Sequence, residues 1–415
     1  MVCRLLIKLV LLQLSISICG CGFLRSASQE TGLMFNRLVA SNKRESSLDR
    51  IEKEEPEYLL DSVFGSRNGR KNPKQHQDET KARELMASAD QLYQEGIQLR
   101  NQAQASGSKE HISKLVEAGK AYERAGEYWI NSTVEQDALF KAGESYFFAD
   151  YYKKANDLFE RLVKYYEGTR YADALHARRF AIAQYWLELA KTEPQVPLTL
   201  NWTDQERPMN DTAGNAIRVL NRIRLDHPTG KIADDATLAL ANAYFDKERF
   251  MDAADTYEDL RINFPNSEHQ FHAHLFELRS RLEAYQGPHY DGTHLDTADK
   301  LLKAIVSQFP GKAEGHQEVL TRENARIRKM KAEREMALAS YYEARGAYEA
   351  AGLHYQQVRA EYQNTPLATD ANERLAQISD RPKKTNEPPE WVAKLFPEPK
   401  PAEPLFGTSL KDQIR

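Results

Sequence analysis

Cysteine and histidine are the residue types in this sequence that could bind a metal, form a covalent intermediate or accept a modification. The three cysteines, Cys3, Cys19 and Cys21, all lie near the N-terminal end of the 415-residue chain. No cysteine follows Cys21, which excludes a thiol nucleophile, a cysteine-based zinc site and an internal disulfide framework in the body of the protein. The chemistry open to the cysteines is therefore limited to the N-terminal segment.

Five histidines that lie close together in the sequence are candidate metal ligands. They are His269, His272 and His274, followed by His289 and His294. Spacings of three and two residues do not place the first three on one face of a helix, and no HExxH motif is present. We interpret the cluster as a surface helix rich in histidine. The sequence also lacks the Gly-x-Ser-x-Gly, P-loop and Gly-x-Gly-x-x-Gly motifs. We therefore expect no enzyme, no metal site and no cofactor.

The charge of the chain argues against a protein that binds nucleic acid. The net charge is −4, and the basic residues are spread along the whole sequence. Domains that bind nucleic acid usually concentrate Lys and Arg on one face and are basic overall. We therefore expect protein partners and a membrane attachment, and no nucleic acid.

Residues 1–20 have the pattern of a lipoprotein signal peptide. Two basic residues precede an apolar stretch at residues 9–18, which is too short to span a bilayer of roughly 20 helical residues. The stretch ends in Ile18-Cys19-Gly20-Cys21, which resembles the bacterial lipobox. Cys21 fits the lipidated position, with palmitate among the acyl chains, because a small residue precedes it. An ordinary cleaved signal peptide and an uncleaved anchor are the alternatives.

A lipid on Cys21 would attach the protein to a membrane, because several acyl chains together anchor a protein effectively permanently. By the sorting rule of such lipoproteins, Gly22 in place of an aspartate implies the bacterial outer membrane, and we expect the body on its periplasmic face. Residues 21–80 are polar and almost aperiodic, so we expect a lipidated flexible tether with one short helix at Glu57–Val63. Its basic pairs either touch lipid headgroups or belong to a solvated linker.

The body of the chain, residues 81–379, is expected to be an all-α domain built from a repeat. Six expected helix ends carry a ring side chain, and an alanine lies eleven residues before each of them. The ring residues are Trp129, Tyr166, His227, Phe264, Phe309 and Tyr362, and the alanines are Ala118, Ala155, Ala216, Ala253, Ala298 and Ala351. Further apolar residues lie seven and four positions before each ring. These steps place all four positions on one helix face, with a small residue where two helices approach closely.

A helix breaker follows each ring residue, as in Pro265-Asn266, Pro310-Gly311 and Asn364-Thr365-Pro366. The pattern resembles the second half of the tetratricopeptide repeat, in which Ala-x3-Phe is followed by proline. The first helix of the motif carries a small residue three positions before a tyrosine. Three repeats satisfy this at the expected distance: Gly143 with Tyr146, Ala241 with Tyr244, and Ala339 with Tyr342. Repeats one, three and five have longer connections. We predict an α-solenoid of about six tetratricopeptide-like helix pairs, between a disordered tether and a disordered tail.

Over roughly residues 130–379 the chain also resembles the family of the outer-membrane assembly lipoprotein BamD. The resemblance rests on the lipobox, on the Phe-Pro-Asn-Ser junction at Phe264–Ser267, and on a long charged helix that ends in Tyr-Tyr-x-x-Arg-Gly-Ala-Tyr at Tyr341–Tyr348. It implies a lipid-anchored scaffold that binds the β-barrel insertase, with unfolded outer-membrane protein precursors as further partners. The long tether, the C-terminal tail and six rather than five repeats depart from the family.

One alternative function uses the same kind of repeat. It is a tetratricopeptide cell-envelope protein that coordinates peptidoglycan synthesis or division with the outer membrane. The family of that kind carries an N-terminal trimerising coiled coil, whereas residues 22–80 show no sustained heptads. We therefore favour the assembly scaffold.

The C-terminal residues 380–415 contain seven of the 17 prolines, together with Trp391, Phe396 and Phe406. Apolar side chains in an extended proline-rich segment are typical of peptides that dock into a partner. A disordered tail with incidental aromatic residues has the same composition, so both interpretations stay open.

The candidate partner-binding residues follow from the repeat register. In tetratricopeptide arrays the first helices line a groove, particularly at the two positions after the motif tyrosine. Those positions hold Phe147 and Phe148 in one repeat, and Phe245 and Asp246 in another. We expect Tyr146 in the core, and three consecutive aromatic residues cannot share one ~100°-wide stripe. At least one of Phe147 and Phe148 should then face the groove; the alternative is that both pack against the adjacent repeat.

Overall fold

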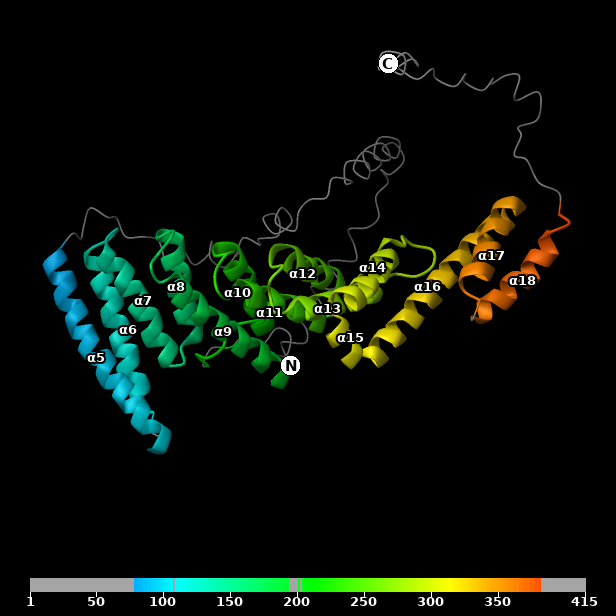
Figure 1. Cartoon of the computed structure of the whole chain (residues 1–415). Helices are drawn as coiled ribbons and strands as arrows, with labels where there is room; N and C mark the ends of the chain where they lie inside the picture. Colours follow the sequence, from blue (N-terminus) through cyan, green and yellow to red (C-terminus); the bar gives the residue numbers. More distant parts are fainter. Residues whose placement is uncertain (1–77, 107–108, 194–200, 202–203, 364, 382–415) are drawn as a thin grey trace, which may run out of the picture. The chain divides into compact units, whose positions relative to one another are not determined.

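The computed structural model describes residues 78–106, 109–193, 201, 204–363 and 365–381, and the regular secondary structure in this part is entirely helical. Fourteen α-helices, α5 to α18, follow one another along the described chain, and each contacts the next (Figure 1). The predicted all-α fold is therefore confirmed. Cys21, the expected helix at Glu57–Val63 and the C-terminal aromatic residues lie outside the described residues.

Twelve of the helices form six pairs. The first helices of the pairs are α5 (Glu79–Ser106), α7 (Thr133–Phe148), α9 (Ala172–Thr192), α11 (Ala233–Asp246), α13 (Gln270–Ala284) and α16 (Gln317–Ala344). The second helices are α6 (Glu110–Tyr128), α8 (Tyr152–Tyr165), α10 (Thr212–Asp226), α12 (Phe250–Asn263), α14 (Thr293–Gln308) and α17 (Tyr348–Glu361). The structure thus has the predicted number of tetratricopeptide-like pairs.

Two further helices differ from the expected pattern. The short helix α15 (Pro310–Gly315) lies between the last two pairs, and α18 (Pro366–Ile378) follows the last pair. We expected Pro310 and Pro366 only as helix breakers, and both also begin a new helix. Proline suits the first turn of a helix because the amide hydrogen that it lacks has no partner there.

The register predicted for the second helices is confirmed at every repeat. Each of the six ring residues is the C-cap of its helix, from Trp129 after α6 to Tyr362 after α17. The six alanines eleven positions earlier are fully buried, and the residues seven and four positions earlier are also buried. The latter are Tyr122, Phe159, Leu220, Tyr257, Leu302 and Tyr355, and Ala125, Leu162, Ile223, Leu260, Ile305 and Val358.

The turns inside three of the pairs share one hydrogen-bonding scheme. After α7, the amide of Tyr151 donates to the carbonyl of Tyr146 at 2.9 Å, and the amide of Asp150 donates to the carbonyl of Phe147 at 3.2 Å. The turns after α11 and α16 repeat both bonds. This is the Schellman arrangement, which places one residue in the left-handed region. That residue is Asp150, Glu248 or Gly346, with φ of 62°, 58° and 74°.

The third pair follows the motif except at one residue, although its longer connection hides this in the sequence. Helix α9 carries fully buried Ala183 three residues before buried Trp186, so a tryptophan stands where the motif has tyrosine. A loop that includes residues 204–211 then separates α9 from α10. Trp186 fixes this loop, because its indole Nε1 donates to the carbonyl of Glu206 at 2.8 Å. The distance between the first-helix motif and the alanine of the second helix differs from the motif here because the loop is longer. Helix α9 itself is regular.

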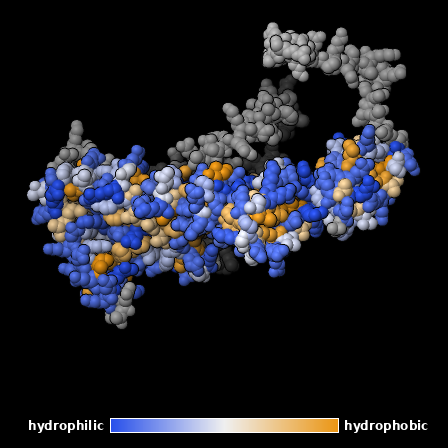
Figure 2. Space-filling view, in the orientation of Figure 1, coloured by the Kyte–Doolittle hydropathy of each residue, from blue (hydrophilic) through white to orange (hydrophobic). Residues whose placement is uncertain are grey.

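Polar residues cover most of the outside of these helices. On the face drawn in Figure 2, hydrophilic residues dominate, and the most extensive hydrophobic patch lies over α13 and α14. Val306 on α14 is 54% exposed. None of the described helices is both long enough and apolar enough to cross a membrane.

Candidate partner-binding surface

Helix α7 ends in three consecutive aromatic residues that have different environments. Tyr146 is 1% exposed, so the prediction that it belongs to the core is confirmed. Phe147 and Phe148 are both half-buried, with ring centroids 5.4 Å apart and ring planes at 80°. Each of them therefore contacts its neighbours and keeps part of its surface accessible.

The two phenylalanines belong to a longer row of half-buried rings. Phe148 lies 6.5 Å from Tyr93 of α5, measured between ring centroids, and Phe147 lies 5.7 Å from Tyr152 of α8. Tyr152 in turn lies 4.9 Å from Tyr185 of α9. We call these five residues, Tyr93, Phe147, Phe148, Tyr152 and Tyr185, the aromatic strip. Four helices from three repeats contribute to it. Phe148 contacts a neighbouring repeat through Tyr93, and both phenylalanines remain partly exposed.

Two arginines lie over the phenylalanine rings. The Cζ atom of Arg178 on α9 is 4.9 Å from the ring centroid of Phe147 and 5.0 Å from that of Phe148. The Cζ atom of Arg100 on α5 is 4.9 Å from the ring centroid of Phe148. A guanidinium over an aromatic ring is attracted to the negative π face and is partly desolvated there. The strip therefore combines apolar surface with positive charge.

Arg178 is held in place by a carboxylate. Its Nε donates to Oε1 of Glu144 at 2.6 Å, and its Nη2 donates to Oε2 of the same residue at 3.1 Å. Glu144 lies one turn before the two phenylalanines on α7, so the bidentate pair fixes α9 against α7 beside the strip. Such a pair gives a defined geometry at a surface where single ion pairs contribute little.

The tyrosines of the strip are neutral hydroxyl groups. Burial raises the pKa of Tyr93 to about 12. The pKa of Tyr152 and that of Tyr185 are also raised, first by burial and then by the nearby Asp150 and Glu206 respectively. At neutral pH these side chains can donate and accept hydrogen bonds but carry no charge. The positive charge of the strip therefore comes from the arginines alone.

The second predicted pair of binding residues lies elsewhere in the array. Phe245 on α11 is half-buried between Phe250 and Phe276, with ring centroids 5.4 Å and 5.7 Å away. Asp246 is exposed and pairs with Lys191 of α9 at 2.8 Å. The structure thus brings Phe147 and Phe148 together on α7, and it places Phe245 and Asp246 on a different first helix.

The sequence did not reveal the other members of the strip. Tyr93 and Arg100 lie on α5, whose offset from the next helix does not match the motif, and Arg178 lies on the irregular third pair. A usable signal was present in Tyr151-Tyr152, a tyrosine pair that follows the Phe-Phe pair after two intervening residues. Its second member reaches back to Phe147 across the tight turn described above.

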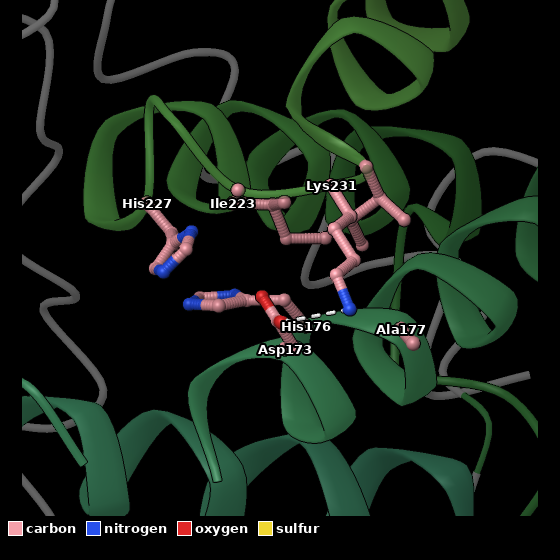
Figure 3. A pocket seen from close by; sticks show the side chains of 8 residues that line it. Asp173, His176, Ala177, Ile223, His227 and Lys231 are labelled. Carbon is pink, nitrogen blue, oxygen red and sulfur yellow. Dashed lines mark ion pairs between the residues drawn. The ribbon is translucent and has the colours of Figure 1, made fainter. Parts of the chain in front are cut away.

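A small cavity lies between the third pair and the turn that leads into α11, and it is separate from the strip. Its volume is about 120 Å³, and it is lined by Asp173, His176, Ala177, Ile223, His227, Gly230, Lys231 and Ile232 (Figure 3). The rings of His176 and His227 face each other with centroids 5.6 Å apart. His176 is 3% exposed, and its Nδ1 has no hydrogen-bond partner among the described residues. Burial, with a contribution from Arg179, lowers the pKa of His176 to about 4.

The histidine cluster of the sequence is dispersed in its interactions. His269 pairs with Asp235 at 2.7 Å, His272 is exposed, and Nδ1 of buried His274 contacts the carbonyl of Gln270 at 2.7 Å. Within the described part of the chain, no group of three or more His, Cys, Asp or Glu side chains is arranged to hold a metal ion. The prediction of a surface helix is therefore wrong for α13, because this helix buries His274 and much of its length, although His272 is exposed.

Comparisons with known proteins agree with the repeat class. Residues 203–387 match a family model described as YfiO, outer membrane lipoprotein, and residues 137–169 match a tetratricopeptide repeat model. No curated protein matches the chain. Two solved structures are similar at 14% identity. One is a tetratricopeptide repeat protein from Parabacteroides merdae (TM-score 0.28, covering 70% of this chain and 100% of that one). The other is the C-terminal part of a tetratricopeptide repeat-containing protein from Cytophaga hutchinsonii (TM-score 0.27, covering 71% of this chain and 99% of that one).

The two family matches cover different parts of the chain. The tetratricopeptide match covers α7 and α8, which carry three of the five strip residues. The lipoprotein match begins after α9 and covers the later pairs, including Phe245 and Asp246. The chain therefore combines tetratricopeptide repeats with a region similar to the YfiO outer membrane lipoproteins.

Proposed function

We propose that this protein is a lipid-anchored scaffold on the periplasmic face of the outer membrane, which binds other proteins during the assembly and insertion of β-barrel outer-membrane proteins. In this role it is similar to the BamD family, and its main partner is the β-barrel insertase. Unfolded outer-membrane protein precursors are a second class of partner. The lipid on Cys21 and the tether at residues 21–80 belong to the same proposal.

The observation that carries the proposal is the aromatic strip. Its five rings lie on four helices of tetratricopeptide repeats, and all five are half-buried although the motif residue beside them, Tyr146, is fully enclosed. Partly exposed aromatic side chains that are fixed by their neighbours are the residues that contribute most to protein binding. Stacked helix pairs also present such residues on a continuous surface, which suits an extended or helical partner segment.

The similarity of residues 203–387 to outer membrane lipoproteins supports the compartment. The match of residues 137–169 to the tetratricopeptide repeat supports a scaffold, since stacked repeats present extended surfaces for protein binding. Phe245 and Asp246 lie within this matched region, and we propose them as a second contact site.

Affinity purification of the full-length lipoprotein from detergent-solubilised membranes, followed by mass spectrometry, tests the proposal. We expect the β-barrel insertase among the proteins that are recovered in proportion to the bait. Recovery of peptidoglycan synthases in its place would support the alternative envelope role described above. The double variant Phe147→Ala, Phe148→Ala should lose this recovery. Its control is Tyr290→Ala, which removes a ring that is 60% exposed and lies outside the strip.

A further inference from the structure

We infer that the aromatic strip binds a peptide segment in which a carboxylate lies beside an aromatic or large apolar side chain, and that Arg100 is the group that pairs with the carboxylate. The inference rests on the proposed function and names the chemistry of the partner at that same surface. It depends on which charges near the strip are already balanced.

The charge of Arg178 is balanced within the protein. Both oxygens of Glu144 accept hydrogen bonds from it, and the carboxylate is largely enclosed, with 14% of its side chain exposed. A partner carboxylate would compete with Glu144 for the same donors. Arg178 is therefore part of the fixed frame of the strip.

Arg100 has a different environment. It is half-buried, it lies over Phe148, and no described carboxylate forms an ion pair with it. Two acids that precede Arg100 on α5 are engaged elsewhere. Asp90 accepts from the hydroxyl of Tyr122 at 2.5 Å and from Lys141 at 2.7 Å, and Glu95 pairs with Lys114 at 3.5 Å. Among the described residues, Arg100 is thus a cation beside Phe148 of the strip that forms no ion pair with a carboxylate.

The aromatic rings favour the same kind of partner. The faces of an aromatic ring are negative and its edge is positive. Guanidinium groups lie over a negative face of the rings of Phe147 and Phe148. A ring edge attracts carboxylate and carbonyl oxygens, and an aromatic ring also packs well against another ring in an edge-to-face arrangement. An acidic segment with an aromatic side chain matches both features, whereas a basic segment would be repelled by Arg100.

Peptide binding to the purified full-length protein tests this inference by fluorescence anisotropy. The probe is a labelled peptide of sequence Ser-Glu-Phe-Glu-Phe-Ser, compared with one that has Lys for both Glu and one that has Ala for both Phe. With the native protein, we expect the Glu/Phe peptide to bind at least about ten-fold more tightly than either variant, since the Lys peptide places like charges beside Arg100 and the Ala peptide lacks both anchor rings. Arg100→Glu should reverse the preference between Glu and Lys and leave the preference for Phe over Ala.

The matched control is Arg345→Glu. Arg345 lies over the ring of Tyr341 with Cζ 4.4 Å from the centroid, so it repeats the arginine–aromatic contact on another pair. This variant should keep the native preference for the Glu/Phe peptide. If Arg345→Glu and Arg100→Glu change the preference equally, or if neither changes it, the assignment to Arg100 is wrong.

Two outcomes separate this inference from the proposed function. Suppose that none of the peptides is distinguished, while Phe147→Ala with Phe148→Ala still abolishes recovery of the natural partner. The strip is then a binding surface and the inferred chemistry is wrong. If the double variant recovers the natural partner normally, the strip is not the partner site and the proposed function itself fails at this surface.

Discussion

Gly143 of α7 lies directly against the ring of Phe159 of α8, so closely that a β-carbon on Gly143 would be 2.4 Å from Cε1 of the ring. The same glycine is the small residue of the first-helix motif, and Phe159 is the large residue of the second-helix motif. The pair therefore explains why the motif requires both. Gly143→Ala should lower the free energy of unfolding by about 1–3 kcal/mol, the usual cost of overpacking, despite the higher helix propensity of alanine.

A second glycine provides the control for this prediction. Gly352 also lies inside a helix, α17, but a β-carbon there would meet only Cδ1 of Ile378 at 3.9 Å, an ordinary contact. Gly352→Ala should therefore stabilise the protein by about 0.5–1 kcal/mol. Urea denaturation of both variants measures the difference. Equal midpoints for the two would show that the close approach of α7 and α8 does not limit the side chain at residue 143.

The shared turn after α7, α11 and α16 gives a prediction about the backbone. Glu248 has a φ of 58°, a conformation that costs a residue other than glycine about 1 kcal/mol, and its side chain is exposed. Glu248→Gly should therefore raise the free energy of unfolding by up to about 1 kcal/mol. Gly346→Ala, at the equivalent position with a φ of 74°, should lower it by a similar amount. Thermal unfolding of the two single variants checks the opposite signs; shifts of the same sign would contradict this explanation.

His176 should make stability depend on pH. Its folded pKa of about 4 lies below the ordinary value of 6.5, so the unfolded chain binds the proton more tightly. The free energy of unfolding should therefore fall as the pH is lowered from about 6.5 to about 4, by about 3 kcal/mol from this residue. Urea midpoints between pH 7 and pH 4 measure the slope. His176→Leu should flatten it, and an unchanged slope in this variant would mean that the buried ring is not responsible.

Local and periodic features of the fold could be predicted from the sequence. The alanine, aromatic and aliphatic positions of the second helices recur at fixed distances from a helix end. The buried positions of each second helix could therefore be assigned from that repeat alone. All six ring residues, such as Phe264, proved to be C-caps for that reason. Helix α15 was missed because Pro310 both ends one helix and begins the next, and the sequence pattern contains only the first of these signals.

The candidate site could be predicted only in part, because most of it is not local. Phe147 and Phe148 follow a motif residue, so they could be named from the sequence. Tyr93 and Tyr185 join them through contacts between repeats, and the offsets of those repeats vary with the length of their connections. The partners of charged residues are also set by the fold. No pattern in the sequence shows that Arg178 is neutralised by Glu144.

Membrane attachment gives a prediction about the N-terminus. Cys21→Ala should release the protein from membranes, because the proposed lipid on Cys21 would be the anchor. Fractionation of cells that carry the variant, washed at high salt to remove bound partners, measures this. A variant that still sediments with the outer membrane after that wash would be incompatible with a lipid on Cys21.

The most direct test of the central proposal is to measure partner recovery and melting temperature together for the double variant Phe147→Ala, Phe148→Ala. Both rings are half-buried, so their loss should leave most of the packing intact while it removes the middle of the aromatic strip. We predict that recovery of the β-barrel insertase from solubilised membranes falls to background while the melting temperature stays near that of the native protein. A large fall in melting temperature, or normal recovery at a normal melting temperature, would contradict the proposal that this surface binds the partner.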